Sequence, residues 1–244
     1  MLLNKVIAVT GSEGLLGKSI VEELKKHNAV VISLDLANQN DINNGKLYCD
    51  ITNELSVIDT ISLILQKYNR IDGWVNNAYP RNEYWGKLIE DLPVEAWREN
   101  VDSHLNGYFL CCKHVLGVMK SQQFGSIVNL ASIYGFLAPD FSIYEGTNIV
   151  NPIGYSAIKG GIINLSRYLA SYYGPKNIRV NCVSPGGIYD NQDPVFVEKY
   201  IHKTPMKRMG IPDDISPVIC FLLSEGSKYI TGQNIVVDGG WSIV

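Results

Sequence analysis

The sequence lacks a strong excess of charge of either sign. Its 21 Lys and Arg residues nearly balance its 24 Asp and Glu residues, which leaves a formal net charge of −3 over 244 residues. Because no block is rich in Lys and Arg, we expect no nucleic-acid partner. Disordered chains combine few apolar residues with high net charge, whereas 46% of this chain is apolar, enough for a sizeable core.

Long apolar runs are also absent. A stretch such as Val218–Leu223 is far shorter than the roughly 20 residues that a membrane helix needs. The first ten residues are apolar but have neither a basic start nor a small-residue cleavage site, so they predict a buried strand rather than a signal peptide. We therefore expect a cytoplasmic protein without a membrane partner.

The five cysteines form no C-x-x-C pair and no metal-binding spacing. Each lies in an apolar run and their number is odd, which predicts reduced core side chains in a cytoplasmic protein and no metal site. They are Cys49, Cys111, Cys112, Cys182 and Cys220.

Short β-branched runs alternate with helix-like segments along the chain, and no linker divides it. The pattern predicts strands at 5–10, 29–34, 72–76, 126–130, 178–183 and 234–237, a further apolar run at 47–49, and helices at 14–27, 53–68, 94–119, 156–173 and 213–223. This alternation favours one α/β domain over residues 1–244, with a Rossmann-type doubly wound parallel sheet of about seven strands and helices on both faces.

Three glycines stand between the first strand and the first helix. Gly11 permits a tight turn, Gly14 lets the backbone approach a diphosphate, and Gly17 lets the helix pack against the strand. The phosphates then meet the free N–H groups at the helix start. This loop, with Ser12 and Leu16, predicts a dinucleotide site.

Asp35 ends the second strand, 18 positions after Gly17. A carboxylate there accepts both ribose hydroxyls of an adenosine and repels a 2′-phosphate, and Ser12 and Leu36 supply no cation, so NAD is predicted over NADP. Asp50 follows the run at 47–49. It accepts a hydrogen bond from the adenine amino group or caps the next helix, and the sequence leaves both open.

A tyrosine and a lysine, Tyr155 and Lys159, follow Ser132 at Y-x-x-x-K spacing. Four residues make about one helical turn, so the phenol and the ammonium share a face. A free phenol titrates near pH 10, too high to take a proton from an alcohol at neutral pH, and a nearby ammonium lowers that pKa. The three residues therefore predict an acid–base site.

Together these motifs resemble the single-domain branch of the short-chain dehydrogenase/reductase family over nearly the whole chain. The resemblance implies hydride transfer between a nicotinamide and a carbonyl/alcohol pair. Tyr155 is then the general acid/base, Lys159 holds the nicotinamide ribose and tunes Tyr155, and Ser132 binds the reacting oxygen. The matching motifs are Thr10-Gly11…Gly17, Asp35, Asp50, Asn76-Asn77-Ala78, Ser132, Tyr155-x-x-x-Lys159 and Pro185-Gly186.

The resemblance implies further features around this centre. Residues near 188–212 are expected to form a small substrate lid, and the chain is expected to pair into a homodimer or homotetramer. The implied additional cofactor contacts are Asp50, Ile51, Asn77, Ala78, Pro185, Gly186 and Ile188.

The chain also departs from the family pattern. The glycine spacing G-x-x-G-x-x-G is typical of a longer, sugar-nucleotide-modifying branch. Tyr79 replaces a glycine after Asn77-Ala78, and His104 replaces an asparagine that supports a water in the family's proton relay. We therefore count His104 as a candidate catalytic residue, with simple space-filling as the alternative.

The gap between Ser132 and Tyr155 is 23 residues, about ten more than in most single-domain members. The extra segment, Ile143–Ile153, is polar, and an insertion beside the catalytic pair is expected to line the substrate pocket, where polar groups suit a hydroxyl-rich ligand. The alternative is a surface loop. The predicted substrate contacts are Arg81, Tyr134, Glu145, Thr147 and Asn148.

Several of these segments resemble bacterial members associated with flagellin modification and with unusual acidic sugars of surface glycans. The sequence thus favours an NAD(H)-dependent oxidoreductase that interconverts a hydroxyl and a ketone on a sugar-derived small molecule. Two alternatives stay open: a sugar epimerase or dehydratase that recycles NAD, and a non-catalytic dinucleotide-sensing regulator.

Overall fold

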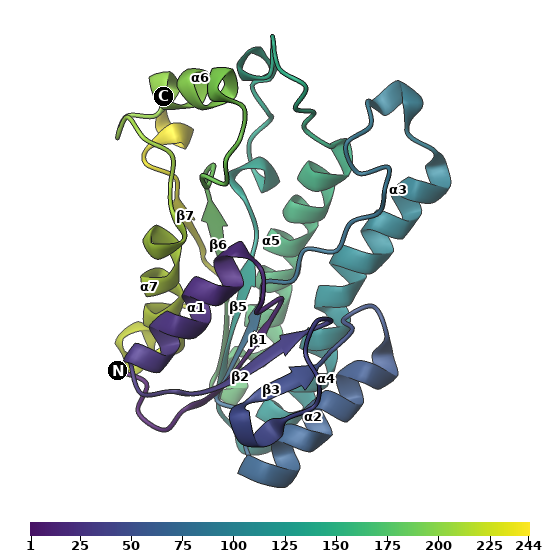
Figure 1. Ribbon diagram of the computed structural model, residues 1–244. Coiled ribbons are helices and arrows are strands. Elements are labelled where there is room, and N and C mark those ends of the chain that lie inside the picture. The colour runs from purple at the N-terminus through teal and green to yellow at the C-terminus, as the bar shows by residue number, and fades with distance from the viewer.

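Seven parallel strands form one sheet in the order β3-β2-β1-β4-β5-β6-β7. The computed structural model describes residues 1–244, and Figure 1 shows the sheet between two layers of helices. The chain turns back between β1 and β4, and ligands bind at such a reversal in doubly wound sheets. The predicted fold class is confirmed. The strands are β1 (Val6–Thr10), β2 (Val30–Asp35), β3 (Lys46–Tyr48), β4 (Gly73–Asn76), β5 (Gly125–Leu130), β6 (Ile178–Pro185) and β7 (Asn234–Val237).

The two faces of the sheet carry separate apolar cores, as expected for parallel strands that are covered on both sides. In Figure 1, α1 and α7 lie together on one face, and α2, α4 and α5 lie on the other. Ser19 Oγ of α1 donates a hydrogen bond of 2.8 Å to Asp213 and lies 2.9 Å from Ser216 Oγ, and these contacts join the first pair. The helices are α1 (Leu15–Lys26), α2 (Glu54–Tyr68), α3 (Val94–Val101), α4 (Gly107–Gln122), α5 (Ile153–Tyr173), α6 (Pro194–Lys203) and α7 (Pro212–Leu223).

The predicted long helical segment over Val94–Met119 is present, although its winding is not α-helical throughout. A π-helical turn, Asp102–Asn106, separates α3 from α4. The apolar periodicity runs through this turn, so the pattern alone does not reveal the wider winding. Such turns occur often at functional sites, and this one carries His104 into the interior with its side chain fully buried.

Two helix starts also differ from the prediction. Helix α5 begins at Ile153 rather than Ser156, which places Tyr155 in its first turn. Helix α7 begins at Pro212 after the cap residue Ile211, so Asp213 lies inside the helix and is not its cap. Pro is favoured in the first helical turn because its missing N–H is not needed there.

Helix α6 was not predicted as a helix, and it falls inside the predicted lid region 188–212. Its Lys199 donates hydrogen bonds to the backbone oxygens of Ser142 (3.0 Å) and Glu145 (2.7 Å), and Lys203 pairs with Asp140. Because these three acceptors belong to the segment before α5, α6 and the inserted segment are tied together.

All five cysteines are free and buried, as expected. No helix of the structure combines the length and the apolar character that crossing a membrane requires.

Candidate active site

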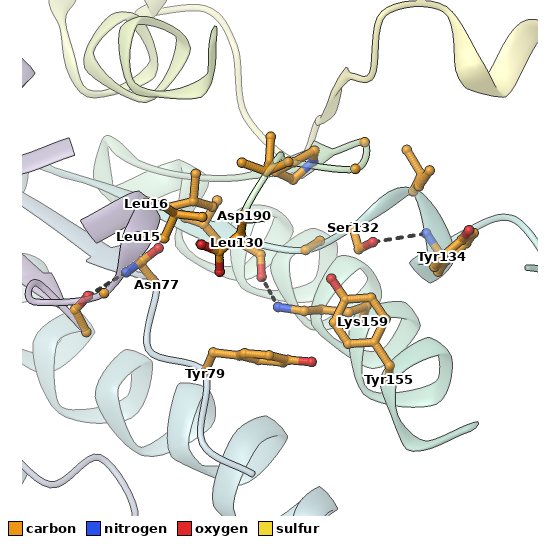
Figure 2. Close-up of a pocket in the computed structure, with 18 of the residues that line it drawn as sticks. Leu15, Leu16, Asn77, Tyr79, Leu130, Ser132, Tyr134, Tyr155, Lys159 and Asp190 are labelled. Carbon is orange, nitrogen blue, oxygen red and sulfur yellow. Dashed lines mark hydrogen bonds between the residues drawn. The ribbon is translucent and has the colours of Figure 1, made fainter. Parts of the chain in front are cut away.

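A cavity of about 750 Å³ opens at the carboxyl ends of the strands. Its walls come from the loops after β1, β2, β4, β5 and β6 and from the start of α5, so residues far apart in the sequence meet there. Figure 2 shows Leu15 and Leu16 on one side and Ser132, Tyr155 and Lys159 on the other. The volume is within the usual range for a small-molecule site.

The glycine loop is a close-packed turn beneath the start of α1. Gly11 has φ +65°, and a Cβ there would lie 2.6 Å from the Cα of Ala78. A Cβ on Gly17 would lie 2.1 Å from the oxygen of Gly11. No side chain caps α1 and no acid stands in its first turn, so the helix start suits an anion. The loop therefore fits a diphosphate.

Asp35 lies on the cavity wall at the end of β2. Its carboxylate accepts hydrogen bonds of 3.0 Å from the backbone N–H groups of Glu13 and Ala37, which fixes the acid against the glycine loop. A cation that was not expected from the sequence lies near the glycine loop: Lys46 Nζ is 3.6 Å from Glu13 Oε1. Because Glu13 pairs with that cation and also lines the cavity, this end has no unpaired positive charge from Lys46.

Most of the predicted cofactor residues line the cavity, and the others lie outside its wall. Gly11, Gly14, Leu16, Asp35, Asn77, Pro185, Gly186 and Ile188 line it, with Tyr155 and Lys159, whereas Ser12, Gly17, Asp50, Ile51 and Ala78 do not. Asp50 accepts a hydrogen bond of 2.9 Å from the N–H of Thr52, and Asn53 is the residue that caps α2. The open alternative of Asp50 as the helix cap is thus wrong, and its adenine contact stays a prediction.

Asn77 holds the glycine loop from the neighbouring strand. Its Nδ2 donates hydrogen bonds of 3.1 Å to the oxygen of Thr10 and 2.9 Å to that of Gly11. Thr10 Oγ1 in turn accepts from the backbone N–H of Asn77 at 3.1 Å and of Ala78 at 3.2 Å. Asn77 was expected only as a cofactor contact, and its role in bracing the glycine loop is an addition.

The structure brings Ser132, Tyr155 and Lys159 together on the cavity wall (Figure 2). Ser132 follows β5, and its Oγ accepts a hydrogen bond of 3.2 Å from the N–H of Tyr134. Burial raises the pKa of Tyr155, and the neighbouring Ser132 hydroxyl opposes that rise. The expected lowering of the Tyr155 pKa by Lys159 is therefore not found, because burial outweighs it. A phenol in this state is protonated at neutral pH and is suited to donate a proton.

Lys159 is a buried cation with few polar partners. Its side chain is 4% exposed, and its Nζ donates a hydrogen bond of 2.7 Å to the oxygen of Leu130. The rings of Tyr79, Tyr108 and Tyr155 have their centres 5.6–5.8 Å from that nitrogen. Burial lowers the pKa of Lys159 to about 7, so the group titrates near neutral pH.

His104 completes the surroundings of this lysine from the π-helical turn. Its Nε2 lies 3.4 Å from Lys159 Nζ, and its Nδ1 has no hydrogen-bond partner. Burial, and secondarily the charge of Lys159, hold the pKa of His104 well below its usual value. The imidazole is therefore neutral, and its Nε2 is placed to accept a hydrogen bond from the Lys159 ammonium.

An aromatic wall beside the catalytic residues was only partly foreseen. Tyr79 lines the cavity, and its hydroxyl accepts a 2.8 Å hydrogen bond from Trp85 Nε1. Its ring lies edge-on to that of Tyr155 at 5.8 Å, and the Arg81 guanidinium stands over the same ring at 5.4 Å. Sequence reasoning missed Trp85, although three aromatic residues within seven positions after Ala78 were a signal.

The inserted segment reaches the cavity through one side chain, Tyr144, rather than through the three predicted residues. Glu145 and Asn148 are exposed away from the cavity wall. The Thr147 hydroxyl is used inside the segment, where it donates 2.8 Å to the oxygen of Tyr144. The predicted placement of these three side chains on the cavity wall is wrong because the local turn directs them elsewhere. Arg81 and Tyr134 do line the cavity.

The family model described as enoyl-(acyl carrier protein) reductase matches residues 12–242. The chain belongs to the short-chain dehydrogenase/reductase family. It is an oxidoreductase of that family, as the sequence motifs predicted.

Three relatives illustrate the range of this family. Post-translational flagellin modification protein A of Campylobacter coli is 37% identical, with all of both chains covered. The 7alpha-hydroxysteroid dehydrogenase of Bacteroides fragilis is 31% identical, with 98% of this chain and 95% of that protein covered. A crystal structure of a short chain dehydrogenase from Leptospira borgpetersenii with bound NAD+ superposes with a TM-score of 0.89 at 36% identity, covering 99% of this chain and 94% of that one.

Proposed function

We propose that this short-chain dehydrogenase/reductase uses NAD(H) to interconvert a hydroxyl and a ketone on a sugar or sugar-derived small molecule. We place it in the cytoplasm, as a homodimer or homotetramer, in the synthesis of sugars for bacterial surface glycans or flagellin. The observation that carries the substrate class is the polar rim around Tyr155, where Arg81 stands on one side and two phenol hydroxyls on the other.

NAD(H) is supported by the adenosine end of the cavity. The glycine loop and the uncapped start of α1 suit the diphosphate, and Asp35 suits two ribose hydroxyls. Glu13 also lines this end and pairs with Lys46, so that this ammonium is not left free to bind a 2′-phosphate. The crystal structure from Leptospira borgpetersenii, with NAD+ bound, points the same way. When bound, this cofactor supplies or accepts the hydride.

The chain's own residues supply the proton. Tyr155 donates its phenolic proton to the carbonyl oxygen during reduction and removes one from the alcohol during oxidation. Ser132 holds the same oxygen beside Tyr155. The Lys159 ammonium, close to the Tyr155 ring, stabilises the phenolate that forms and orients the ribose.

His104 provides a path for the proton behind Lys159. During alcohol oxidation Tyr155 passes the proton that it has removed to Lys159, and Lys159 gives one proton to the neutral imidazole, whose Nε2 faces it. During ketone reduction the transfers run in reverse: Lys159 reprotonates Tyr155 and His104 returns a proton to Lys159. We therefore propose His104 as a catalytic relay residue, in place of the asparagine that the family pattern carries there.

Other family members act on apolar substrates, but the polar rim around Tyr155 disfavours such substrates for this chain. A steroid or an acyl chain offers little to pair with Arg81, which has neither a hydrogen bond to an acid nor an ion pair. Arg81 is exposed, so a substrate that covers its guanidinium without pairing with it removes water from the charge at a cost in binding energy, and this favours oxygen-rich substrates. The flagellin modification relative supports the same class.

A panel of substrates tests the proposal. Sugar phosphates, nucleotide sugars and precursors of acidic nine-carbon sugars are assayed with NAD+ and NADH beside a hydroxysteroid and a β-ketoacyl thioester. We expect the highest kcat/KM on a member of the sugar group. A higher value on the steroid or the thioester would overturn the substrate class while leaving the oxidoreductase assignment intact.

A further inference from the structure

Two phenol hydroxyls meet at the substrate end of the cavity. Tyr134 Oη lies 3.0 Å from Tyr144 Oη, and Asn151 Nδ2 donates a hydrogen bond of 2.9 Å to Tyr144 Oη. Both tyrosines line the cavity, although they come from different segments. Tyr134 follows Ser132 by two residues, whereas Tyr144 belongs to the inserted segment.

The number of hydrogens at this pair is fixed by its chemistry. Each phenol carries one O–H, and the hydrogen bond between the two hydroxyls uses only one of these two hydrogens. Asn151 donates and so uses no phenolic hydrogen. Whichever tyrosine donates to the other, one O–H is left without an acceptor in the protein. Burial raises the pKa of Tyr134 far above its usual value, so that phenol keeps its proton throughout the accessible pH range.

We propose that the Tyr134–Tyr144 pair is a specificity site that donates one hydrogen bond to an oxygen of the substrate, next to the reacting carbon. The inference rests on the proposed sugar oxidoreductase activity and deepens it, because it names the contact that the inserted segment contributes. The segment then acts through Tyr144 and Asn151 rather than through the residues that its polarity first suggested.

The pair is held in place before any ligand binds. Tyr134 is 8% exposed, and its backbone N–H is bound to Ser132 Oγ, so its position is linked to the catalytic serine. The Tyr144 ring lies against Phe196 of α6, with ring centres 5.4 Å apart. The tie between Lys199 and the inserted segment adds to this support. A donor that is already fixed loses little entropy on binding.

The location of the pair defines the class of substrate further. In Figure 2, Tyr79 and Tyr134 appear on opposite sides of Tyr155. Arg81 stands over Tyr79, so a cation flanks the reacting position on one side and a phenolic O–H flanks it on the other. The fitting molecule carries an acceptor oxygen on one side of its reacting carbon and an anionic or strongly accepting group on the other. Hexuronates and related sugar acids have this pattern.

The test removes the donor from the enzyme and the acceptor from the substrate in the same experiment. Because either single change leaves one phenolic O–H, the donor-free variant is the double change Tyr134→Phe with Tyr144→Phe. Tyr168→Phe is the matched control, since Tyr168 is an exposed phenol on α5 outside the cavity wall. The probes are D-glucose, D-galactose, D-glucuronate and D-galacturonate, with the monodeoxy analogues of whichever one is turned over best. Melting temperature and NADH affinity establish that each variant is folded.

We expect the double variant to lose about tenfold in kcat/KM on the parent sugar, the size of one neutral hydrogen bond, and the control variant to lose nothing. On one monodeoxy analogue the double variant and the wild type should be equal, which identifies the oxygen that the pair binds. An equal loss on every analogue, or no loss at all, would overturn the inference while the wild-type turnover still supports the proposed function. Failure of the wild type to turn over these four probes, with turnover of a sugar from the panel given under the proposed function, would overturn the hexuronate inference alone. Failure on both sets of sugars would contradict the proposed function.

Discussion

The Lys159 ammonium lies 3.4 Å from His104 Nε2, and neither side chain is more than 4% exposed. The pair holds one proton on the lysine below about pH 7, because burial keeps the pKa of Lys159 near 7 and that of His104 well below its usual value. The Lys159 ammonium loses its proton readily and lies next to a neutral imidazole, so a proton can pass directly between the two groups. The pH dependence of turnover and of stability should both report it.

The pH profile of ketone reduction should fall through about pH 7. Reduction needs the Tyr155 phenol and the Lys159 ammonium, and the lysine titrates first because its pKa is lowered while that of Tyr155 is raised. We expect kcat/KM for the ketone at saturating NADH to decline with a single apparent pKa near 7. Lys159→Arg should move this decline to higher pH, since a guanidinium keeps its proton. A wild-type profile that is flat between pH 6 and 9 would refute this account of the lysine.

Lys159→Met should make the folded chain more stable while it removes activity. Below pH 7 the folded state carries a buried ammonium, and methionine fills similar space without a charge; the lost hydrogen bond to Leu130 offsets part of the gain. We expect an increase of about 1–2 kcal/mol in the free energy of urea unfolding at pH 6.

The sign of the pH effect is a further check on Lys159. Between the folded pKa of about 7 and the usual value of 10.5, the unfolded chain binds a proton that the folded chain has released, so wild-type stability rises with pH. The advantage of the methionine variant should therefore shrink as the pH rises from 7 towards 10. A variant that is less stable than the wild type at pH 6 contradicts the buried-cation account.

Asp35→Ala should weaken the preference for NAD(H). The carboxylate lies at the adenosine end, braced by the N–H groups of Glu13 and Ala37. We expect the wild type to use NAD(H) at least about tenfold better than NADP(H), or about 1.4 kcal/mol, and the variant to narrow that ratio. Glu13→Gln should narrow the ratio as well, because it leaves the Lys46 ammonium without its acidic partner and free to attract a 2′-phosphate. Equal kcat/KM for both cofactors in the wild type would disprove the assignment.

Arg81→Ala should raise KM for the sugar substrate by roughly tenfold or more and leave NADH affinity unchanged. The guanidinium stands over Tyr79 on the cavity wall and has no acidic partner of its own. Arg98→Ala is the control, because Arg98 pairs with Glu95 on α3 outside the cavity. Arg81→Lys should recover part of the loss through its charge. An unchanged KM in Arg81→Ala would contradict the claim that Arg81 binds an anionic group of the substrate.

The parallel sheet and the central catalytic residues could be predicted from the sequence, whereas the order of the strands was not predicted. Apolar runs mark the buried strands directly, and the Y-x-x-x-K spacing places Tyr155 and Lys159 on one helical face when the helix includes both, as α5 does. The helix start moved by three residues, yet the pair stayed together. Local patterns with a fixed period survive such shifts.

The substrate side of the cavity was harder to predict, because it depends on contacts between segments. A polar inserted segment suggested Glu145, Thr147 and Asn148, but its turn directs Tyr144 inwards and uses Thr147 within the segment. The partner of Tyr144, Tyr134, lies ten positions earlier, and no periodicity links them. The π-helical turn at His104 was also not predicted. One extra residue in a helical turn leaves the apolar pattern of the sequence nearly unchanged, so the pattern does not reveal it.

The most direct measurement of the central claim is the stoichiometry of NADH formation at 340 nm during turnover of the best sugar substrate. We expect one NADH for each molecule oxidised, and in Tyr155→Phe a fall in turnover of roughly 10²–10⁴ with NADH binding retained, since only the transferable proton is removed. Sugar conversion without net NADH would assign the chain to the epimerase or dehydratase alternative. No conversion by the wild type, or near-normal turnover by Tyr155→Phe, would contradict the proposed oxidoreductase.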